Sequence, residues 1–233
     1  MQILAFSSSR VGNSSYLEMA APVIKSFLAG DALSIAFIPF ASVDSYGPYL
    51  KKVNEGLSSL PHAINLVTNT NAKKTIEDSD VIMIGGGNTF KLLHDLYELD
   101  LINLIKDKVQ TGTPYIGWSA GSNLIGQTIC TTNDMPVIQP ESFDSFGFFP
   151  FQINPHYHNI VMEGFNGETR DQRLEEFLKL NADKKIFCLP EGTYLKFQHD
   201  ELVFGGIAQG VWMTREEGQT IHEIIHPGTI IKL

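Results

Sequence analysis

The chain has 233 residues, of which 43% are hydrophobic and 18% charged, so it can form a packed core and is too apolar to be disordered. Its 26 acidic and 17 basic residues give a net charge of -9, which argues against binding to nucleic acid or to anionic lipid. Cys130 and Cys188 lack the spacing of a zinc site or a disulfide framework, so both are expected to be buried thiols in a reducing compartment.

No targeting or membrane segment is expected. Residues 1–10 contain a short apolar run without the basic start and longer apolar stretch of a signal peptide. No segment approaches the roughly 20 consecutive apolar residues of a membrane span. The sequence therefore predicts a cytoplasmic protein with a single domain over residues 1–233, present as a monomer or homodimer.

Short aliphatic runs alternate with segments of helical period, which predicts an α/β fold with a doubly wound, mostly parallel sheet. Antiparallel strands are predicted at the C-terminal end, and one long irregular segment is of the kind that carries functional residues. In chain order the predicted elements are the strand Gln2–Phe6, a helix with Leu17, Ala20, Ala21, Ile24 and Phe27 on one face that ends at Gly30, the strand Ser34–Ile38, the helix Tyr49–Leu60, the strand Ile64–Val67, the helix Lys73–Asp78, the strand Val81–Ile84, a helix that ends near Leu99, the helix Leu101–Gln110, the strand Pro114–Trp118, the irregular segment Thr131–Asn159, the helix Arg173–Lys179, the strand Lys185–Leu189 and the antiparallel strands Tyr194–Phe204, Gly210–Thr214 and Ile221–Ile225.

The strongest local motif is Gly117-Trp118-Ser119-Ala120-Gly121, a G-x-S-x-G between a predicted strand and a predicted helix. Ser119 at such a turn adopts a strained backbone conformation for which the two glycines leave room, and its hydroxyl lies at the carboxyl end of the sheet. A small-residue connection is the simpler interpretation of the five residues alone. The strand and helix on either side favour Ser119 as a nucleophile.

A serine nucleophile needs a base, and seven histidines are available. Five of them lie on a helix or in polar turns, where a structural or solvated histidine is usual: His62, His94, His199, His222 and His226. The remaining two, His156 and His158, lie in the long irregular segment. No third ligand has matching spacing for a metal, so one of the pair is expected to serve as the base, and the residues alone do not choose between them.

The acid that orients the histidine is expected just after a strand. Glu191 follows the strand Lys185–Leu189, and Asp134 is the competitor, although ordinary turn chemistry explains either residue. Glu191 is favoured. In an α/β-hydrolase the acid precedes the histidine, whereas the order here is serine, histidine, glutamate, so the motif does not imply that fold.

The run Gly85-Gly-Gly-Asn-Thr89 also lies between a strand and a helix, where free N–H groups point at an anion. It lacks the spacing of a dinucleotide site and the lysine of a P-loop. We expect an oxyanion hole formed by the N–H groups of Gly87 and Ala120, although close packing at a glycine-rich turn is the simpler alternative.

Only four residues are arginines, and two of them, Arg170 and Arg173, follow the candidate histidines. A guanidinium binds a carboxylate through two hydrogen bonds, which suits an acidic substrate. Surface ion pairs with Glu168 or Asp171 explain each arginine equally well when it is taken alone.

Seven segments occur in an order that resembles the serine peptidase family of the α-aspartyl dipeptidase peptidase E, which also contains cyanophycinase. The similarity extends over about residues 1 to 205 and rests on Ile38-Pro-Phe-Ala-Ser, Ile84-Gly-Gly-Gly-Asn-Thr-Phe, Tyr115-Ile-Gly-Trp-Ser-Ala-Gly, Thr131-Thr-Asn-Asp-Met-Pro, Gln152-Ile-Asn-Pro-His, Gly167-Glu-Thr-Arg and Leu189-Pro-Glu-Gly.

The resemblance implies a fold like that of the class I glutamine amidotransferases and hydrolysis of dipeptides with an N-terminal aspartate. It implies a triad of Ser119, His156 and Glu191, which selects His156 over His158, with Asp134 as a supporting residue. It also implies oxyanion donors at Gly87 and Ala120 and contacts from Asn88 and Arg170 to the substrate Asp side chain. No metal or organic cofactor is expected, and the only expected partner is a small peptide substrate.

Two alternatives stay open. A cyanophycinase-like or isoaspartyl peptidase would use the same nucleophile, but it would need a groove for a branched polymer. A noncatalytic protein that binds acidic small molecules would keep the scaffold without the chemistry.

Overall fold

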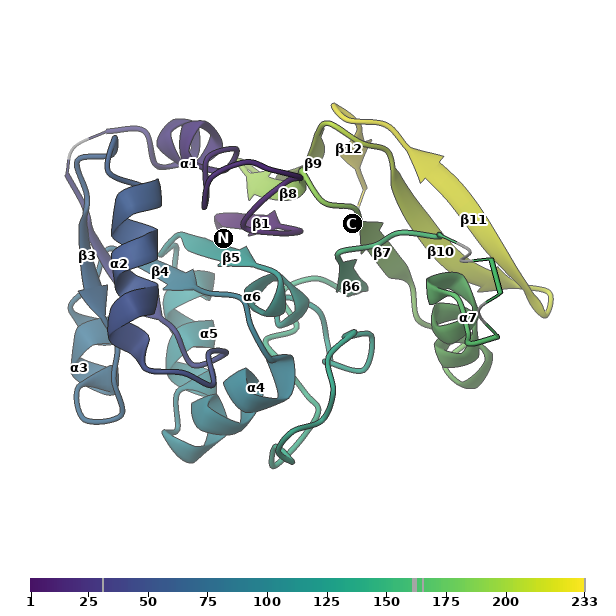
Figure 1. The fold of residues 1–233 in the computed structure, drawn as a ribbon, viewed down its shortest axis with the longest axis horizontal. Coiled ribbons are helices and arrows are strands. Elements are labelled where there is room, and N and C mark those ends of the chain that lie inside the picture. The colour runs from purple at the N-terminus through teal and green to yellow at the C-terminus, as the bar shows by residue number, and fades with distance from the viewer. Residues whose placement is uncertain (31, 161–162, 165, 233) are drawn as a thin grey trace.

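The computed structural model describes residues 1–30, 32–160, 163–164 and 166–232, and its larger sheet has eight strands in the order β12-β9-β8-β1-β5-β4-β2-β3 (Figure 1). The five strands β1, β5, β4, β2 and β3 are parallel, and β8, β9 and β12 continue the sheet in antiparallel fashion. The strands are β1 (Ile3–Phe6), β2 (Ser34–Ile38), β3 (Ala63–Leu66), β4 (Val81–Ile84), β5 (Tyr115–Trp118), β8 (Thr193–Gln198), β9 (Glu201–Gly206) and β12 (Ile230–Ile231). The predicted mostly parallel α/β architecture is confirmed.

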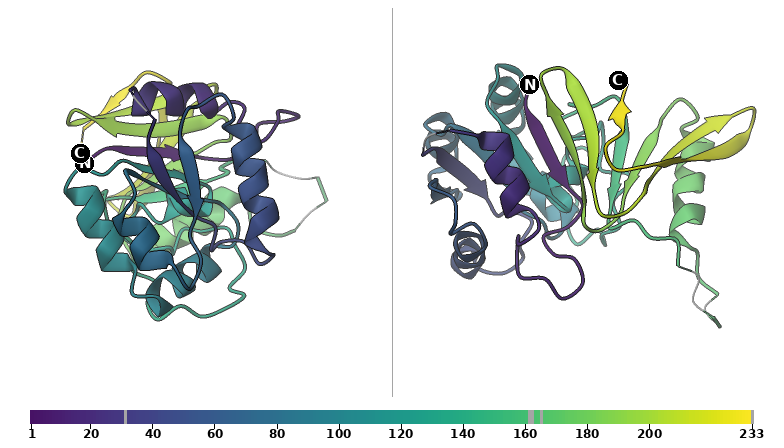
Figure 2. Two further views of the ribbon diagram at one scale, coloured as in Figure 1. Left: turned by 90° about the vertical axis from the view of Figure 1, so that its left-hand side faces the viewer. Right: turned by 90° about the horizontal axis from the view of Figure 1, so that it is seen from above.

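A second sheet of four strands, in the order β11-β10-β7-β6, lies at the other end of the molecule from α2 and α3 (Figure 1). Its members are β6 (Gln152–Pro155), β7 (Ile186–Leu189), β10 (Gly210–Glu216) and β11 (Gln219–Ile225). Strands β6 and β7 are parallel, so their carboxyl ends meet at the same edge. The ribbon of β10 and β11 projects away from the larger sheet (Figure 2).

Helices cover both faces of the larger sheet, and each face has its own apolar core. The helices are α1 (Ala21–Leu28), α2 (Tyr46–Gly56), α3 (Ala72–Glu77), α4 (Thr89–Glu98), α5 (Ile102–Gln110), α6 (Ala120–Asn123) and α7 (Arg170–Leu180). Side chains of α1 and α2 pack on one face, and those of α3, α4 and α5 pack on the other. Successive residues of β4 point to opposite cores, which explains why the strand reads as a continuous apolar run. Helix α7 packs against the second sheet (Figure 1). Within the described ranges, none of these helices has the length and apolar character needed to cross a bilayer.

Two predicted helices begin at other residues. Helix α1 begins at Ala21 because Leu17 has a φ of 57°, which a right-handed helix does not allow, and Pro22 lies in the first turn. Helix α2 begins at Tyr46, three residues earlier than predicted. Pro48 lies in its first turn, where a missing N–H costs nothing.

Four further predictions are wrong in detail. The irregular segment 131–159 contains the buried strand β6. The run 194–204 is a hairpin, β8 and β9, because His199 and Asp200 both have a positive φ and form its turn. Helix α7 begins at Arg170, after a capping box between Thr169 and Gln172. Of the two cysteines that were expected to be buried, Cys188 is buried and Cys130 is exposed.

Candidate active site

Ser119 occupies a tight turn between β5 and α6. Its φ of 54° and ψ of -113° are unfavourable for a residue with a side chain, and its N–H donates to the Phe6 carbonyl. A Cβ on Gly117 would lie 2.7 Å from the backbone of Gly121, and a Cβ on Gly121 would collide with the carbonyl of Ile84. Both glycines are therefore required by packing. Helix α6 has only four residues.

The Ser119 hydroxyl lies in a chain of hydrogen bonds with two side chains from the second sheet. His156 Nε2 is 2.9 Å from Ser119 Oγ, and His156 Nδ1 is 2.9 Å from Glu191 Oε1. His158 is exposed, and its ring lies beside the N–H of Ile160 rather than beside Ser119. The structure therefore brings together Ser119, His156 and Glu191 and leaves His158 apart.

Strand register explains this convergence. Phe6 pairs with Trp118, so Ser7 and Ser119 directly follow a matched pair of parallel strands. Pro155 pairs with Leu189 in the second sheet, so His156 and the turn that carries Glu191 follow another matched pair. The carboxyl ends of both parallel pairs meet at one place, which is where α/β sheets commonly bind ligands.

Ser7, directly after β1, connects the end of β7 to the backbone of His156. It was not predicted as a site residue. Its fully buried hydroxyl donates to the Leu189 carbonyl at 2.7 Å and accepts the His156 N–H at 2.9 Å. His156 has a φ of 53°, so this contact holds a backbone conformation that a histidine rarely adopts. A polar residue directly after the buried strand β1 was the signal that could have identified Ser7.

The glycine-rich loop after β4 lies against the Ser119 turn. A Cβ on Gly86 would lie 2.8 Å from the Ser119 Cβ, and Gly87 has a φ of 140° at a place where an added Cβ would collide with the carbonyl of Ala41. Within the described part of the chain, neither the N–H of Gly87 nor that of Ala120 donates a hydrogen bond. Both donors are therefore available to an oxygen near Ser119.

Asn88 and Asp134 have structural partners at the start of α4. The Asn88 Oδ1 accepts the Lys91 N–H, and its Nδ2 donates to the Met135 carbonyl, so one amide hydrogen remains. Asp134 accepts the N–H of Thr89 at 2.7 Å and also its hydroxyl. Asp134 therefore supplies the negative charge at the start of α4. These hydrogen bonds join it to Thr89 and not to His156.

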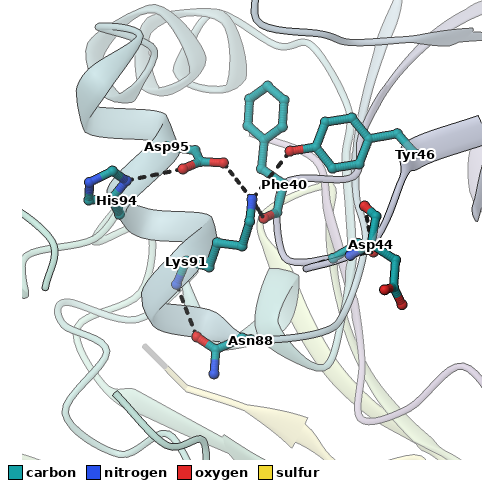
Figure 3. Close-up of polar contacts among 8 residues, drawn as sticks. Phe40, Asp44, Tyr46, Asn88, Lys91, His94 and Asp95 are labelled. Carbon is teal, nitrogen blue, oxygen red and sulfur yellow. Dashed lines mark hydrogen bonds and ion pairs between the residues drawn. The ribbon is translucent and has the colours of Figure 1, made fainter. Parts of the chain in front are cut away.

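Lys91 holds residues 39–46, between the end of β2 and the start of α2, against α4 (Figure 3). The Lys91 ammonium donates to the Phe40 carbonyl, the Tyr46 hydroxyl and Asp95 at 3.0, 3.2 and 2.7 Å. Burial lowers the pKa of Lys91, but the hydrogen bonds to Asp95 and Tyr46 outweigh it and raise the pKa. The carboxylate of Asp44 points away from this network (Figure 3).

Arg170 lies at the first turn of α7 beside Tyr157. Burial is the main cause that lowers its pKa, followed by the positive charge of Arg173, whereas the negative charge of Asp134 acts to raise it. Its Nη1 is buried and has no hydrogen-bond partner in the described part of the chain. A buried guanidinium donor without an acceptor is costly, so Arg170 is suited to bind an anion.

A cleft of about 600 Å³ opens beside Ser119, and we call it the Ser119 cleft. Gly87, Asn88 and His156 lie along one part of it, and the start of α2 lies along another. Arg170, Asp134 and Glu191 are not among its lining residues. In the described ranges, no group of three or more His, Cys, Asp or Glu side chains is placed to hold a metal ion.

An α/β sheet with a serine at a strand–helix turn, bonded through histidine to a carboxylate, defines the class of serine-type hydrolases. The family model described as Peptidase family S51 matches residues 3–204. A protein named Peptidase E from Shewanella sp. (strain ANA-3) is 50% identical over 201 residues, which cover 85% of each chain. A Peptidase E from Haemophilus influenzae is 47% identical over 84% of this chain and 92% of its own. A crystal structure of a peptidase from an acI-B1 Actinobacterium superposes with a TM-score of 0.72 at 17% identity, over 100% of this chain and 96% of the other.

The chain belongs to peptidase family S51. The relatives confirm the predicted class of enzyme, a serine-type dipeptidase, and with it a peptide as the kind of substrate.

Proposed function

We propose that the protein hydrolyses the peptide bond after an N-terminal aspartate in Asp-Xaa dipeptides, with Ser119, His156 and Glu191 as its triad. The observation that carries the proposal is the chain of two 2.9 Å contacts from Ser119 Oγ through the His156 ring to Glu191. The His156 Nδ1–H donates to Glu191, which leaves Nε2 free to accept the serine proton.

The reaction follows from this geometry. His156 Nε2 takes the Ser119 proton while the oxygen attacks the aspartyl carbonyl carbon. The tetrahedral intermediate collapses as His156 returns the proton to the leaving amine, which departs as the second amino acid. Water, deprotonated by the same imidazole, then attacks the aspartyl ester and releases aspartate and the free serine.

The N–H groups of Gly87 and Ala120 are proposed to stabilise the oxyanion. Both lie next to the Ser119 turn and neither has an assigned acceptor in the described part of the chain, so neither has to break a bond to serve. Preorganised donors of this kind contribute about 3 to 4 kcal/mol each to the transition state.

Arg170 is proposed to bind the carboxylate of the substrate Asp side chain, with the remaining amide hydrogen of Asn88 as a second donor. The unpartnered Nη1 of Arg170 supports this role, because an incoming carboxylate would satisfy it. Asp134 is proposed to support the site by fixing the start of α4, and Glu191 rather than Asp134 orients the histidine.

The test is turnover of Asp-Leu by the parent protein and by Ser119→Ala, His156→Ala and His158→Ala. Loss of the nucleophile or the base should reduce kcat on the order of 10⁶-fold, whereas the exposed His158 should matter little. A fluorophosphonate probe should label the parent and fail to label Ser119→Ala. Substantial turnover by a folded Ser119→Ala protein would remove this serine from the mechanism. A parent that cleaves β-Asp-Leu in preference to Asp-Leu would instead support an isoaspartyl peptidase.

A further inference from the structure

We propose that the Ser119 cleft is the subsite for the second residue of the substrate and that Lys52 binds its free C-terminal carboxylate. The inference rests on the proposed function and extends it, because it explains why the enzyme would act on dipeptides. A cation at this place recognises a chain that ends one residue after the scissile bond.

Helix α2 brings Lys52 into the Ser119 cleft. Tyr49 donates its hydroxyl to the Gly86 carbonyl at 3.0 Å and accepts from the Trp118 indole at 3.2 Å, so α2 is bound to the glycine-rich loop and to the residue before Ser119. Lys52 follows Tyr49 by three residues and lies on the same helix face, about 4.5 Å further along the helix axis. Both side chains line the cleft. Lys52 and Ser119 therefore line the same cleft, in which the second residue of a dipeptide bound at Ser119 would lie.

The ammonium of Lys52 has no ion-pair partner among the residues that the structure describes. Neither a hydrogen bond nor an ion pair to its Nζ is found in the described part of the chain, whereas its neighbour Lys51 pairs with Glu55. Asp44 also lines the cleft, but no ion pair between Asp44 and Lys52 is found in the described ranges. Lys52 therefore offers an unpaired positive charge on the wall of the cleft.

The character of the cleft suits a second residue of variable side chain better than an aspartate side chain. Its lining includes the aromatic rings of Tyr16 and Trp118 together with Val43 and Pro48, and its volume of about 600 Å³ is far larger than one carboxymethyl group requires. A site that selects one small acidic side chain needs close polar contacts, and Arg170 lies outside the cleft. The carboxylate that Lys52 meets is thus the one at the end of the peptide.

The experiment compares Asp-Leu with its C-terminal amide in the parent, Lys52→Met, Lys52→Arg and Lys51→Met. A charged hydrogen bond in a partly exposed cleft predicts that the parent prefers the free carboxylate by about tenfold in kcat/KM. Lys52→Met should lower kcat/KM for Asp-Leu to nearly that for the amide and leave the amide within about twofold of the parent. Lys52→Arg should keep the preference, and Lys51→Met, which removes the same charge outside the cleft, should match the parent on both substrates.

Different outcomes separate this inference from the proposed function. If the parent cleaves neither substrate, the proposed function is wrong. If the parent cleaves Asp-Leu and its amide equally well, the function stands and the carboxylate site is wrong. An equal loss on both substrates in Lys52→Met would show that Lys52 acts on the aspartyl half of the substrate or on the fold, and thermal melting of each variant distinguishes these two.

Discussion

The conformation of His156 depends on one hydroxyl. Its φ of 53° is unfavourable for a residue with a side chain, and its N–H donates to the Ser7 hydroxyl. That hydroxyl in turn donates to the carbonyl of Leu189, two residues before Glu191. The imidazole and the carboxylate are therefore positioned by the same buried group. Tyr157 adds a second contact, since its N–H also donates to Leu189.

Ser7→Ala should therefore impair catalysis as well as stability. The His156 N–H loses its acceptor, which should lower the free energy of unfolding by about 1 to 3 kcal/mol. The displaced imidazole should lower kcat for Asp-Leu by up to about 100-fold with a smaller change in KM. Urea unfolding and steady-state kinetics measure the two effects. Ser79→Ala is the matched control, because Ser79 is also buried and donates to a backbone carbonyl, but it lies at the opposite end of β4 from the glycine-rich loop. A Ser7→Ala enzyme with the parent's kcat would show that Ser7 only supports the fold.

Replacing Arg170 should have opposite effects on stability and on activity. In the protein without substrate its Nη1 is buried without a partner in the described chain, so Arg170→Met should keep or raise the melting temperature. The same variant should lose about 30-fold or more in kcat/KM for Asp-Leu, because half of a desolvated charge pair is gone. Arg170→Lys should also be impaired, since an ammonium cannot form two parallel bonds.

The control for Arg170 is Arg173→Met on the same helix. Arg173 faces Glu168 at 3.7 Å, with both side chains more than half exposed, so its removal should change neither property much. Activity of Arg170→Met close to that of the parent would refute the proposed contact with the substrate side chain.

Among the elements, those with both faces buried were predicted best from the sequence. Strands β2 and β4 begin and end where the apolar runs predict, because a strand inside a parallel sheet needs no polar alternation. Strand β6 was missed. Its residues Gln152-Ile-Asn-Pro155 are all buried, but two are polar and one is proline, and only the pairing with β7 makes them a strand.

The same distinction applies to the site. The turn at Ser119 is a local feature, set by two glycines within five residues, and the sequence predicts it directly. The choice between His156 and His158 depends on where β6 ends and on the positive φ that Ser7 supports, and neither is visible in the local sequence. The residues left that choice open, and only resemblance to a family resolved it.

At the scale of the whole molecule, the site joins two sheets. The turns that carry Ser7 and Ser119 follow strands of the larger sheet, whereas the turns that carry His156 and Glu191 follow strands of the second sheet. Helix α7, which carries Arg170, packs on that second sheet (Figure 1). A change in how the sheets meet would therefore separate Ser119 from its partners without altering either sheet.

Stability of the whole molecule should fall in alkali because of its tyrosines. Five of the seven have a raised pKa, with burial as the main cause, and the fully buried Tyr115 is shifted well above its ordinary value. The pKa values of these tyrosines are higher in the folded protein than in the unfolded chain. Their contribution to the free energy of unfolding is therefore complete below about pH 10. It is lost as the pH rises above that value, because the unfolded chain then ionises first. Each fully buried tyrosine should lower the free energy of unfolding by about 1.4 kcal/mol per pH unit in that range. Urea unfolding at several pH values, with phenolate absorbance followed in parallel, measures the slope.

Tyr115→Phe isolates one of these groups. The variant loses a hydrogen bond from the tyrosine hydroxyl to the Gly121 carbonyl, so it should be less stable than the parent near neutral pH. Above about pH 10 its free energy of unfolding should fall less steeply than that of the parent, by about 1.4 kcal/mol per pH unit, because phenylalanine has no proton to lose. The two curves should therefore converge as the pH rises. Parallel curves would mean that Tyr115 ionises as readily in the folded protein as in the unfolded chain, and the burial of its hydroxyl between β5 and the Ser119 turn would then not control its proton.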